Sequence, residues 1–148
     1  MSDLNKMKVM LDPGAYLPQR AHEKDAGYDL FSPKRFVLGP HEVRAIDTGV
    51  HIQLPDGKCG IVFSKSGLLK DHAVLSMGLI DEPYRGAIGA ILVNLSGQHL
   101  TFAKGEKISQ FFITNYYAYD LEVVNALNET DRGSGGFGST GRMCDEQV

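Results

Sequence analysis

A glycine-rich stretch near the C-terminus holds the residues best suited to chemistry. Residues 132–141 read Arg-Gly-Ser-Gly-Gly-Phe-Gly-Ser-Thr-Gly, with five glycines and no residue suited to anchor a core strand. Glycine lets backbone N–H groups turn toward an anion without a side chain in the way. Arg132 adds a planar fork suited to phosphate oxygens, and Ser139 and Thr140 add hydroxyl donors. Phe137 offers a flat face on which a base can stack. The stretch predicts a flexible clamp for a nucleotide with several phosphates.

Two other interpretations of this stretch are open. Composition alone favours a disordered Gly/Ser tail, but such a tail has no use for an arginine and a phenylalanine at fixed places. Gly133, Gly135 and Gly138 match the G-x-G-x-x-G fingerprint, which needs a strand before it, a helix after it and a further strand. Only seven residues follow Gly141, so a dinucleotide fold is not expected. The Gly-Lys-Ser/Thr of a Walker loop is also missing.

A second informative stretch, residues 78–86, runs from apolar residues straight into a carboxylate, a proline turn, a tyrosine and a glycine. Asp81, held at the end of a strand, is placed to accept a hydrogen bond from a water and direct it. Tyr84 is placed to pack against a sugar. The alternative is that Asp81 only begins a turn and Tyr84 is a rim aromatic, and this stretch by itself favours that alternative slightly.

Three further polar groups stand in apolar surroundings. Residues 63–68 contain a cation, two hydroxyl groups and a glycine, and they lie between a strand and the start of a helix. This arrangement suits phosphate, because helix N-termini attract anions. Ser66 is equally suited to be only a helix cap. Asp29, on an otherwise apolar strand, is either a metal-side carboxylate or a solvent-facing alternate. Gln110 lies in a strongly apolar strand and needs a partner, either a ligand or a structural hydrogen bond.

The elements that position these residues are short strands separated by turn residues. Strands are expected at residues 8–11, 26–31, 36–38, 46–54, 58–64, 73–75, 78–80, 87–95, 100–103, 107–117 and 121–124, with 73–75 and 78–80 as the arms of a tight hairpin. Residues 66–71 are the one segment with a helical pattern. The sequence therefore predicts an all-β, jelly-roll-like barrel or double sheet. Residues 87–95 are apolar on both faces, which suggests that the outer face meets another subunit.

Composition limits the class of protein. The 148 residues, 43% hydrophobic and 22% charged, are typical of one globular domain. The net charge is −3 and no basic run is present, so a nucleic-acid partner is not expected. Cys59 and Cys144 lie far apart, which argues against a disulfide framework or a zinc site. With no signal segment and no run of membrane-spanning length, we expect a cytosolic or nuclear protein that is neither secreted nor membrane-bound.

Taken together, five segments resemble, in order, the five motifs of the homotrimeric dUTPase family (deoxyuridine 5'-triphosphate nucleotidohydrolases). They are residues 26–30, 64–68, 78–81 with 84–86, 105–110 and 132–141. The resemblance implies a jelly-roll-like β-clip fold over residues 1–131 and a C-terminal arm, 132–148, that closes an active site between the subunits of a trimer. It also implies Mg²⁺-assisted hydrolysis of dUTP to dUMP and pyrophosphate, which limits dUTP and supplies dUMP for dTMP synthesis.

The resemblance also implies roles for single residues. Asp81 is expected to orient the water that attacks the α-phosphorus, Asp29 to bind Mg²⁺ through water, and Tyr84 to pack under the deoxyribose. The other substrate-binding residues are Lys65, Ser66, Gly67 and Gln110 at the phosphates, and Gly78, Leu79 and Ile80 at uracil through the hairpin backbone. In the arm, Arg132, Ser139 and Thr140 are expected at the terminal phosphates and Phe137 stacked on uracil, and Gly138 is a further substrate-binding residue.

The sequence departs from the family pattern in places. Lys65 stands where the family usually has arginine, which keeps the charge but loses the bidentate fork. The segment from residue 75 to 78 is short beside familiar members. Two alternatives remain open at this point: a relative of the dCTP deaminases, which would need a glutamate beside the C4 amine, and a nucleotide-sensing regulatory protein.

Overall fold

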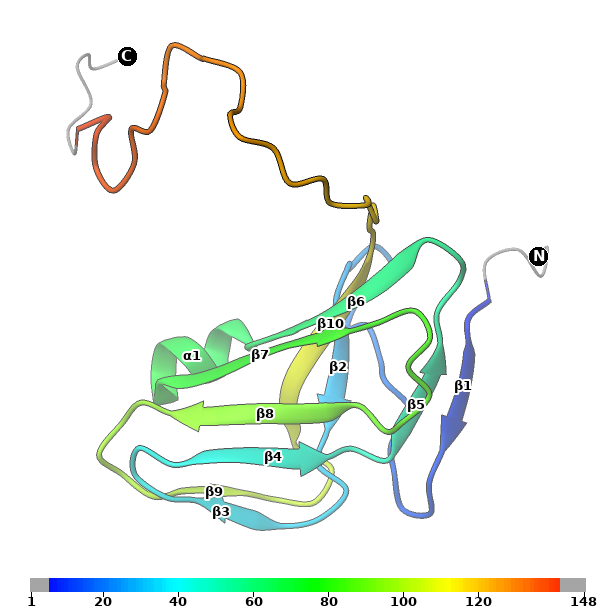
Figure 1. The fold of residues 1–148 in the computed structure, drawn as a ribbon. Coiled ribbons are helices and arrows are strands. Elements are labelled where there is room, and N and C mark those ends of the chain that lie inside the picture. The colour runs from blue at the N-terminus through cyan, green and yellow to red at the C-terminus, as the bar shows by residue number, and fades with distance from the viewer. Residues whose placement is uncertain (1–5, 142–148) are drawn as a thin grey trace. The chain divides into compact units, whose positions relative to one another are not determined.

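The computed structural model describes residues 6–141, in which every regular element but one is a strand (Figure 1). The elements are β1 (Lys8–Leu11), β2 (Tyr28–Phe31), β3 (Phe36–Leu38), β4 (Val43–Asp47), β5 (Val50–Gln53), β6 (Lys58–Phe63), α1 (Ser66–His72), β7 (Val74–Ile80), β8 (Gly89–Asn94), β9 (Leu100–Phe102) and β10 (Lys107–Asn115). The predicted all-β class is confirmed, and the helical segment begins at Ser66 as expected.

Six strands form one antiparallel sheet in the order β2-β10-β6-β7-β8-β4. The other four form two antiparallel pairs, β1 with β5 and β3 with β9. Figure 1 shows the large sheet curling from β4 around to β2 rather than lying flat. This curled arrangement is jelly-roll-like, as the spacing of short strands predicts.

The alternating stretch from residue 46 to residue 54 turns its even-numbered side chains inward, as predicted. All five are at most 3% exposed. The structure divides the stretch into β4 and β5 because the chain bends at Gly49, where φ is +66° and a Cβ would lie 2.9 Å from the Cβ of Ala15. The bend moves the chain from the large sheet to the β1–β5 pair, and the inward alternation continues across it.

Two hydrophobic clusters fill the interior. The first contains Leu30, Val50, Ile52, Leu54, Val62, Ile80, Ile88 and Phe111, and the second Phe36, Leu38, Ile46, Val74, Ala90, Leu92, Phe102 and Ile108. Strand β7 contributes to both clusters, Val74 to the second and Ile80 to the first, so β7 ends in the core. The loop that follows is therefore anchored to the rigid part of the fold.

Leu92, in β8, is fully buried in the second cluster. We expect Leu92→Ala to lower the free energy of unfolding by about 3 kcal/mol, because it removes buried methyl groups and leaves a cavity. Urea unfolding followed by circular dichroism measures the change. Leu121→Ala is the matched control, since Leu121 is 95% exposed, and it should leave the unfolding midpoint unchanged. Equal midpoints for the two variants would contradict this assignment of the core.

Two predicted elements are wrong. Residues 73–80 do not form a hairpin: β7 is one continuous strand, because β8 pairs with its first part and β6 with its second part. The strand expected at 121–124 is also absent, since residues 118–141 contain no strand. Leu121 and Val123 are 95% and 99% exposed, so their alternation has no neighbouring strand within the described chain to pair with.

The chain divides into two units, the first ending at Tyr117 and the second beginning at Ala118. The first holds the ten strands and the one helix found in residues 6–141. The second holds only turns and extended chain within its described part, residues 118–141. The predicted functional division at residue 131 falls inside this second unit, and Cys144 lies outside the described residues. Among the described residues, no helix is long and apolar enough to cross a membrane.

Candidate active site

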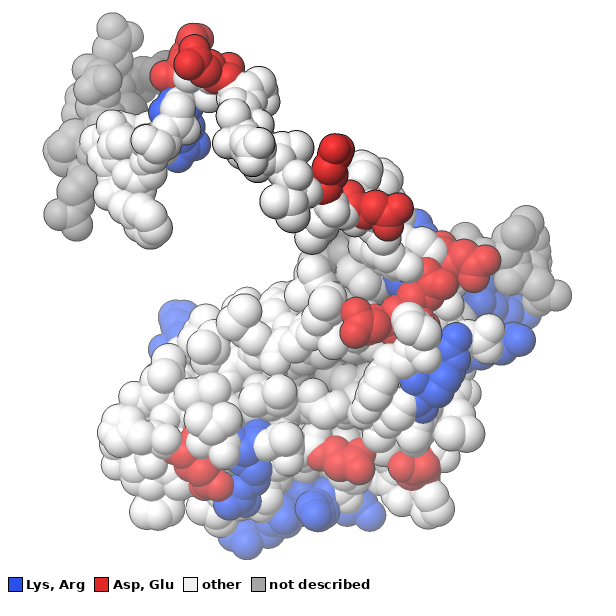
Figure 2. Space-filling model, viewed as in Figure 1, with Lys and Arg blue, Asp and Glu red and all other residues white. Residues whose placement is uncertain are grey.

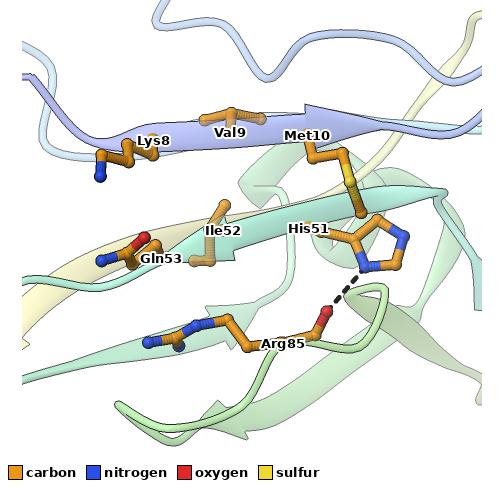
Figure 3. A pocket seen from close by; sticks show the side chains of 7 residues that line it. All are labelled: Lys8, Val9, Met10, His51, Ile52, Gln53 and Arg85. Carbon is orange, nitrogen blue, oxygen red and sulfur yellow. Dashed lines mark hydrogen bonds between the residues drawn. The ribbon is translucent and has the colours of Figure 1, made fainter.

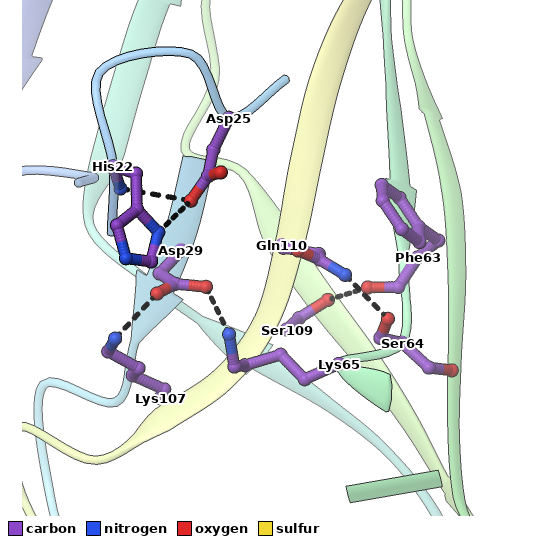
Figure 4. Close-up of polar contacts among 9 residues, drawn as sticks. All are labelled: His22, Asp25, Asp29, Phe63, Ser64, Lys65, Lys107, Ser109 and Gln110. Carbon is purple, nitrogen blue, oxygen red and sulfur yellow. Dashed lines mark hydrogen bonds and ion pairs between the residues drawn. The ribbon is translucent and has the colours of Figure 1, made fainter. Parts of the chain in front are cut away.

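Asp29 is the buried centre of a cluster of cations. Asp29 lies on β2, opposite Gln110 of β10, and it is only 4% exposed. One carboxylate oxygen pairs with the ammonium of Lys65, and the other lies 2.8 Å from Nζ of Lys107 (Figure 4). Lys65 comes from the segment before α1 and Lys107 from the first position of β10. Three distant parts of the sequence therefore meet at one carboxylate.

The two lysines decide the charge of Asp29. Burial raises the pKa of this carboxyl, because a charged group is costly away from water. Hydrogen bonds from Lys107 and Lys65 act in the opposite direction and outweigh burial, so the pKa of Asp29 lies below its ordinary value. The carboxylate therefore stays ionised, and the cluster as a whole carries an excess of positive charge.

The loop before α1 is fixed by buried hydroxyl groups. Ser64 accepts a 2.7 Å hydrogen bond at its Oγ from the backbone N–H of Ser76 in β7. Ser109 of β10 donates to the backbone oxygen of Phe63 at 3.0 Å, and its hydroxyl lies 2.9 Å from that of Ser76. Both Ser76 and Ser109 are at most 1% exposed. This network holds the point at which the chain leaves β6 and presents Lys65 and the start of α1.

The side-chain amide of Gln110 makes a structural hydrogen bond. Its amide nitrogen donates to the backbone oxygen of Ser64 at 2.9 Å (Figure 4). A Cβ at Gly27 would lie 2.8 Å from the side-chain oxygen of Gln110, so glycine at 27 makes room for this amide. The helix cap considered for Ser66 is not formed, because the residue at the cap position is Lys65 and no side chain caps the helix.

Asp81 and Tyr84 share a turn that begins where β7 ends. The backbone N–H of Tyr84 donates to the backbone oxygen of Asp81 at 3.0 Å, and the Tyr84 hydroxyl donates to the backbone oxygen of Ala87 at 3.0 Å. The ring of Tyr84 lies over Gly86, where a Cβ would be only 2.3 Å from the hydroxyl oxygen. Both Asp81 and Tyr84 are exposed, so the turn presents a carboxylate and a ring together.

Glu82 fastens this turn to two other parts of the fold. Its Oε2 accepts hydrogen bonds from the backbone N–H of Gly57, at 2.7 Å, and from the hydroxyl of Tyr116, at 2.8 Å. The Tyr116 and Gly57 bonds lower the pKa of Glu82, which therefore stays an acceptor. Glu82 and Tyr116 also border a cavity of about 350 Å³, which is lined by Cys59, Leu79, Asp81, Glu82, Pro83 and Tyr116. Asp81 thus lies on the wall of a cavity.

Gly78, Leu79 and Ile80 lie on β7, opposite Val62, Ile61 and Gly60 of β6. On the other side of β7, β8 pairs only as far as Ser76, and Figure 1 shows the two strands diverging beyond that point. In an antiparallel strand, the backbone groups of successive residues point alternately to its two sides. The β7–β8 ladder therefore does not include the N–H and C=O groups of residues 77–80 that point to this side.

Within the second unit, the glycine-rich arm is a series of tight turns. Arg132 Nε donates to the backbone oxygen of Gly135 at 2.9 Å, and the N–H of Ser139 donates to the backbone oxygen of Gly136 at 3.1 Å. Phe137 is fully exposed, with φ at +50°. Gly138, Ser139 and Thr140 follow in exposed turns. The guanidinium, hydroxyl groups and ring of the arm therefore do not pack into a hydrophobic core.

Sequence reasoning missed Lys107 and Glu82 as residues that shape the site. Lys107 lies inside a recognised motif segment, but its contact with Asp29 requires the register between β2 and β10. Residues 6–141 contain no group of three or more His, Cys, Asp or Glu side chains that would hold a metal ion without a ligand. Any ion at Asp29 would have to share its coordination with a substrate.

The fold and the site together define a class of protein, namely an all-β, jelly-roll-like protein with cations and hydroxyl groups around one buried carboxylate. Comparisons with known proteins agree. Residues 14–141 match the family model described as dUTPase. The deoxyuridine 5'-triphosphate nucleotidohydrolase of Mus musculus is 40% identical over 90% of this chain and 83% of its own. The corresponding protein of Clostridium novyi is 44% identical over 86% of this chain and 92% of its own.

Solved structures give the same result. The dUTPase of Staphylococcus bacteriophage 80alpha with dUPNHPP has a TM-score of 0.87 and 29% identity, over 93% of this chain and 99% of that one. A mutant dUTPase of phage phi11 of S. aureus, described for its coordination of a structural Mg(II) ion, has a TM-score of 0.76 and 27% identity, over 82% and 98%. The chain belongs to the dUTPase family.

Proposed function

We propose that the protein hydrolyses dUTP to dUMP and pyrophosphate, which limits dUTP and supplies dUMP for dTMP synthesis. Membership of the dUTPase family supports this reaction. The observation that carries it is the turn after β7, where the exposed carboxylate of Asp81 and the exposed ring of Tyr84 stand together beside the 350 Å³ cavity. A carboxylate and a sugar-sized aromatic face in one rigid turn suit a nucleotide whose α-phosphorus is attacked.

Asp81 acts as the general base. It accepts a proton from a water, whose oxygen bonds to the α-phosphorus while the bond from that phosphorus to the bridging oxygen breaks. Pyrophosphate leaves with the electron pair of the broken bond. A positioned base of this kind contributes about 10²–10⁴-fold to the rate, and Glu82 holds the turn so that the carboxylate does not have to be ordered during the reaction.

The phosphates bind at the start of α1 and at the cations around Asp29. Lys65, Ser66 and Gly67 offer an ammonium, a hydroxyl and backbone N–H groups in sequence, and the buried hydroxyl network holds them in place. Gln110 has two amide N–H donors, of which one holds Ser64, and the second is assigned to phosphate. Lys107 adds a second ammonium to the same cluster.

Mg²⁺ fits this site as an ion that arrives with the nucleotide. Magnesium in nucleotide sites is usually held by one or two carboxylates together with substrate phosphates, and Asp29 is the one buried carboxylate among the described site residues. We assign Asp29 to the ion's water shell. When bound, Mg²⁺ would reduce the charge on the phosphate oxygens. Lys65 and Lys107, which neutralise Asp29 here, would then be available to the phosphates.

Uracil recognition is assigned to the backbone of Gly78, Leu79 and Ile80. The end of the β7–β8 pairing at Ser76 supports this, because backbone donors and acceptors of residues 77–80 lie outside that ladder. A base whose edge does not match would leave such groups unpaired, which costs affinity. The base contact therefore comes from a strand edge rather than from the hairpin that the sequence predicts. Phe137, Arg132, Gly138, Ser139 and Thr140 of the arm are assigned to the base and the terminal phosphates.

A substitution at Gly86 tests the role of Tyr84 without changing the tyrosine itself. Gly86 does not have a positive φ, so alanine suits its backbone, but the new Cβ would collide with the ring of Tyr84. We expect Gly86→Ala to displace the ring and to lower kcat/KM for dUTP about tenfold. Gly89→Ala is the matched control, because no atom lies within 4 Å of a Cβ there. Equal kcat/KM values for the two variants would contradict the sugar-packing role.

A homotrimer is proposed because one face of the sheet is apolar and exposed. Val43 on β4, Ile91 on β8, and Met77 and Leu79 on β7 are 64%, 43%, 68% and 66% exposed. Figure 2 shows the surface over β7 and β8 almost free of charged side chains, which is typical of a face that meets another subunit. Light scattering measures the mass, and a monomer would contradict this assignment.

The location is proposed from the state of Cys59 and from the net charge. Cys59 is a buried free thiol, in keeping with a reducing compartment, so the cytoplasm, or the nucleus of a eukaryotic host, is proposed. Neither a membrane nor a nucleic acid is proposed as a partner, since the net charge is −3 and nucleic-acid binding favours a basic face. Fractionation of cells that express the tagged protein would test this assignment.

The reaction is tested with four nucleotides. Purified protein with Mg²⁺ is given dUTP, UTP, dTTP or dCTP, and pyrophosphate and ammonia are measured. We expect pyrophosphate from dUTP alone, because the site must reject a 2'-hydroxyl, a 5-methyl and a 4-amino group. Equal turnover of all four, or none of dUTP, would contradict the proposal. Ammonia released from dCTP would identify a deaminase instead.

A further inference from the structure

The loop of residues 81–86 is held at its far end by a side chain outside all five motif segments. The backbone oxygen of Arg85 lies 2.8 Å from Nδ1 of His51, which belongs to β5 (Figure 3). Arg85 follows Tyr84 directly, so this contact fixes the backbone next to the proposed sugar-packing ring. Together with Glu82 at the near end, it leaves the loop little freedom to move.

His51 has a second acceptor on its other side. Its Nε2 lies 3.2 Å from Oδ2 of Asp12, as an ion pair rather than a well-aligned hydrogen bond. The side chain of His51 is only 18% exposed, and it lies beside Met10 of β1 at the edge of a cavity of about 210 Å³ (Figure 3). The imidazole therefore bridges the segment after β1 and the 81–86 loop.

Two acceptors on either side of one imidazole favour its protonated form. A neutral imidazole has one N–H, whereas the imidazolium has two. If the neutral ring donates to the Arg85 oxygen, the lone pair of its Nε2 faces the Asp12 carboxylate. The surrounding charged groups are Asp12, Asp47 of β4, and Lys8 and Arg85 along the same cavity. The guanidinium of Arg85 is directed to the backbone oxygens of Glu82 and Tyr84.

The pKa of His51 agrees with this geometry. The hydrogen bond to the Arg85 carbonyl is the largest cause that raises it above its ordinary value, and the Asp12 carboxylate adds to the effect. A raised pKa means that the contribution to stability is complete below about pH 6.5, the ordinary value for histidine. That contribution is lost as the pH rises through the higher pKa of the folded protein.

We propose that His51 is a positioning residue for dUTP hydrolysis: its protonated ring ties Asp12 to the Arg85 carbonyl and so holds the loop that carries Asp81 and Tyr84. This inference rests on the proposed function. The ring touches no substrate atom in this role and acts through the loop backbone. Turnover therefore depends on the charge of a group remote from the phosphates, and it weakens as that charge is lost.

Two substitutions at His51 separate the hydrogen bond from the charge. His51→Asn keeps an N–H at a position like that of Nδ1 but does not titrate, and it therefore imitates neutral histidine. His51→Leu removes both contacts. We expect kcat of the wild type to exceed that of His51→Asn about threefold near pH 6, and the two to converge near pH 9. His51→Leu should be about tenfold lower throughout.

His99→Asn is the matched control, because His99 is an exposed histidine, and its ratio to the wild type should not change with pH. A wild-type to His51→Asn ratio that is constant with pH, together with a normal kcat for His51→Leu, would overturn the proposal. If His51→Leu does not fold, Asp12→Asn replaces it, since removing this carboxylate should lower the pKa of His51 and move the convergence to lower pH.

Two measurements do not depend on turnover. NMR titration of the His51 ring should give a pKa above the ordinary value for histidine, and Asp12→Asn should lower it. Hydrogen exchange of the 81–86 amides, corrected for intrinsic rates, should be faster in His51→Leu than in the wild type. If the wild type does not hydrolyse dUTP, the proposed function fails. The positioning role fails separately if the wild type hydrolyses dUTP, but loop exchange is unchanged in His51→Leu and the His51 pKa is unchanged in Asp12→Asn.

Discussion

Asp81→Asn should lower kcat for dUTP about 10³-fold and leave nucleotide binding intact. Asparagine has the shape of aspartate but does not accept the proton of the attacking water, and a positioned base contributes about 10²–10⁴-fold. Affinity should not fall, because the substitution removes a negative charge beside a polyanion. Single-turnover rates measure the chemical step, and calorimetry with a non-hydrolysable dUTP analogue measures binding.

Asp56→Asn is the matched control for this prediction. Asp56 lies in the exposed turn between β5 and β6, so the same chemical change there should leave kcat unaltered. The Asp81 variant must also keep the wild-type unfolding midpoint, since Asp81 is exposed at the end of β7 and contributes little to the core. A variant that retained more than about a tenth of the wild-type rate would show that another group is the base.

The parts of the fold that the sequence predicts well are those set by local patterns. Inward alternation from residue 46 to residue 54 follows from the period of two in a strand, and it holds even though Gly49 divides the stretch. The helix after Lys65 follows from a strand ending beside a short run of helix formers. Asp81 and Tyr84 occupy one turn because only two residues separate them.

The parts that the sequence does not predict depend on which strands become neighbours. Residues 73–80 suggest two hairpin arms locally, but β6 and β8 each supply a partner for part of one long strand. The pairing of Lys107 with Asp29 requires the register of β10 on β2. His51 and Arg85 are 34 residues apart in sequence. None of these contacts has a local pattern. The contacts of Lys107 with Asp29 and of His51 with Arg85 are the two that shape the candidate site.

The nature of Asp29 changes most between sequence and structure. On the sequence alone it is either a metal-side carboxylate or a solvent-facing alternate, whereas the structure buries it between two ammonium groups. A buried carboxylate needs such partners. The same lysines bear positive charge, so the proposed arrival of a nucleotide with its metal ion would be an exchange of partners among charges already assembled. Such an exchange avoids leaving any of these charges unpaired.

Ending the chain at Asp131 should lower kcat/KM for dUTP about 10³-fold without affecting the fold. The removed segment holds Arg132, Phe137, Ser139 and Thr140, whose contacts are assigned to the bound nucleotide. Loss of a single preorganised donor costs about 10²–10³-fold, and closure over the substrate also excludes water. No residue of the described arm belongs to either core cluster, so the unfolding midpoint should stay that of the full chain.

Mixing two defective chains tests whether the arm acts on its own subunit or on a neighbour. The truncated chain keeps Asp81 but lacks the arm, and full-length Asp81→Asn keeps the arm but lacks the base. If the arm of one subunit closes the site of another, trimers reassembled from both chains should regain a substantial part of the wild-type kcat/KM. If each arm closes its own site, the mixture should stay as inactive as its components. Normal kcat/KM in the truncated chain alone would refute the closing role, whatever the mixture does.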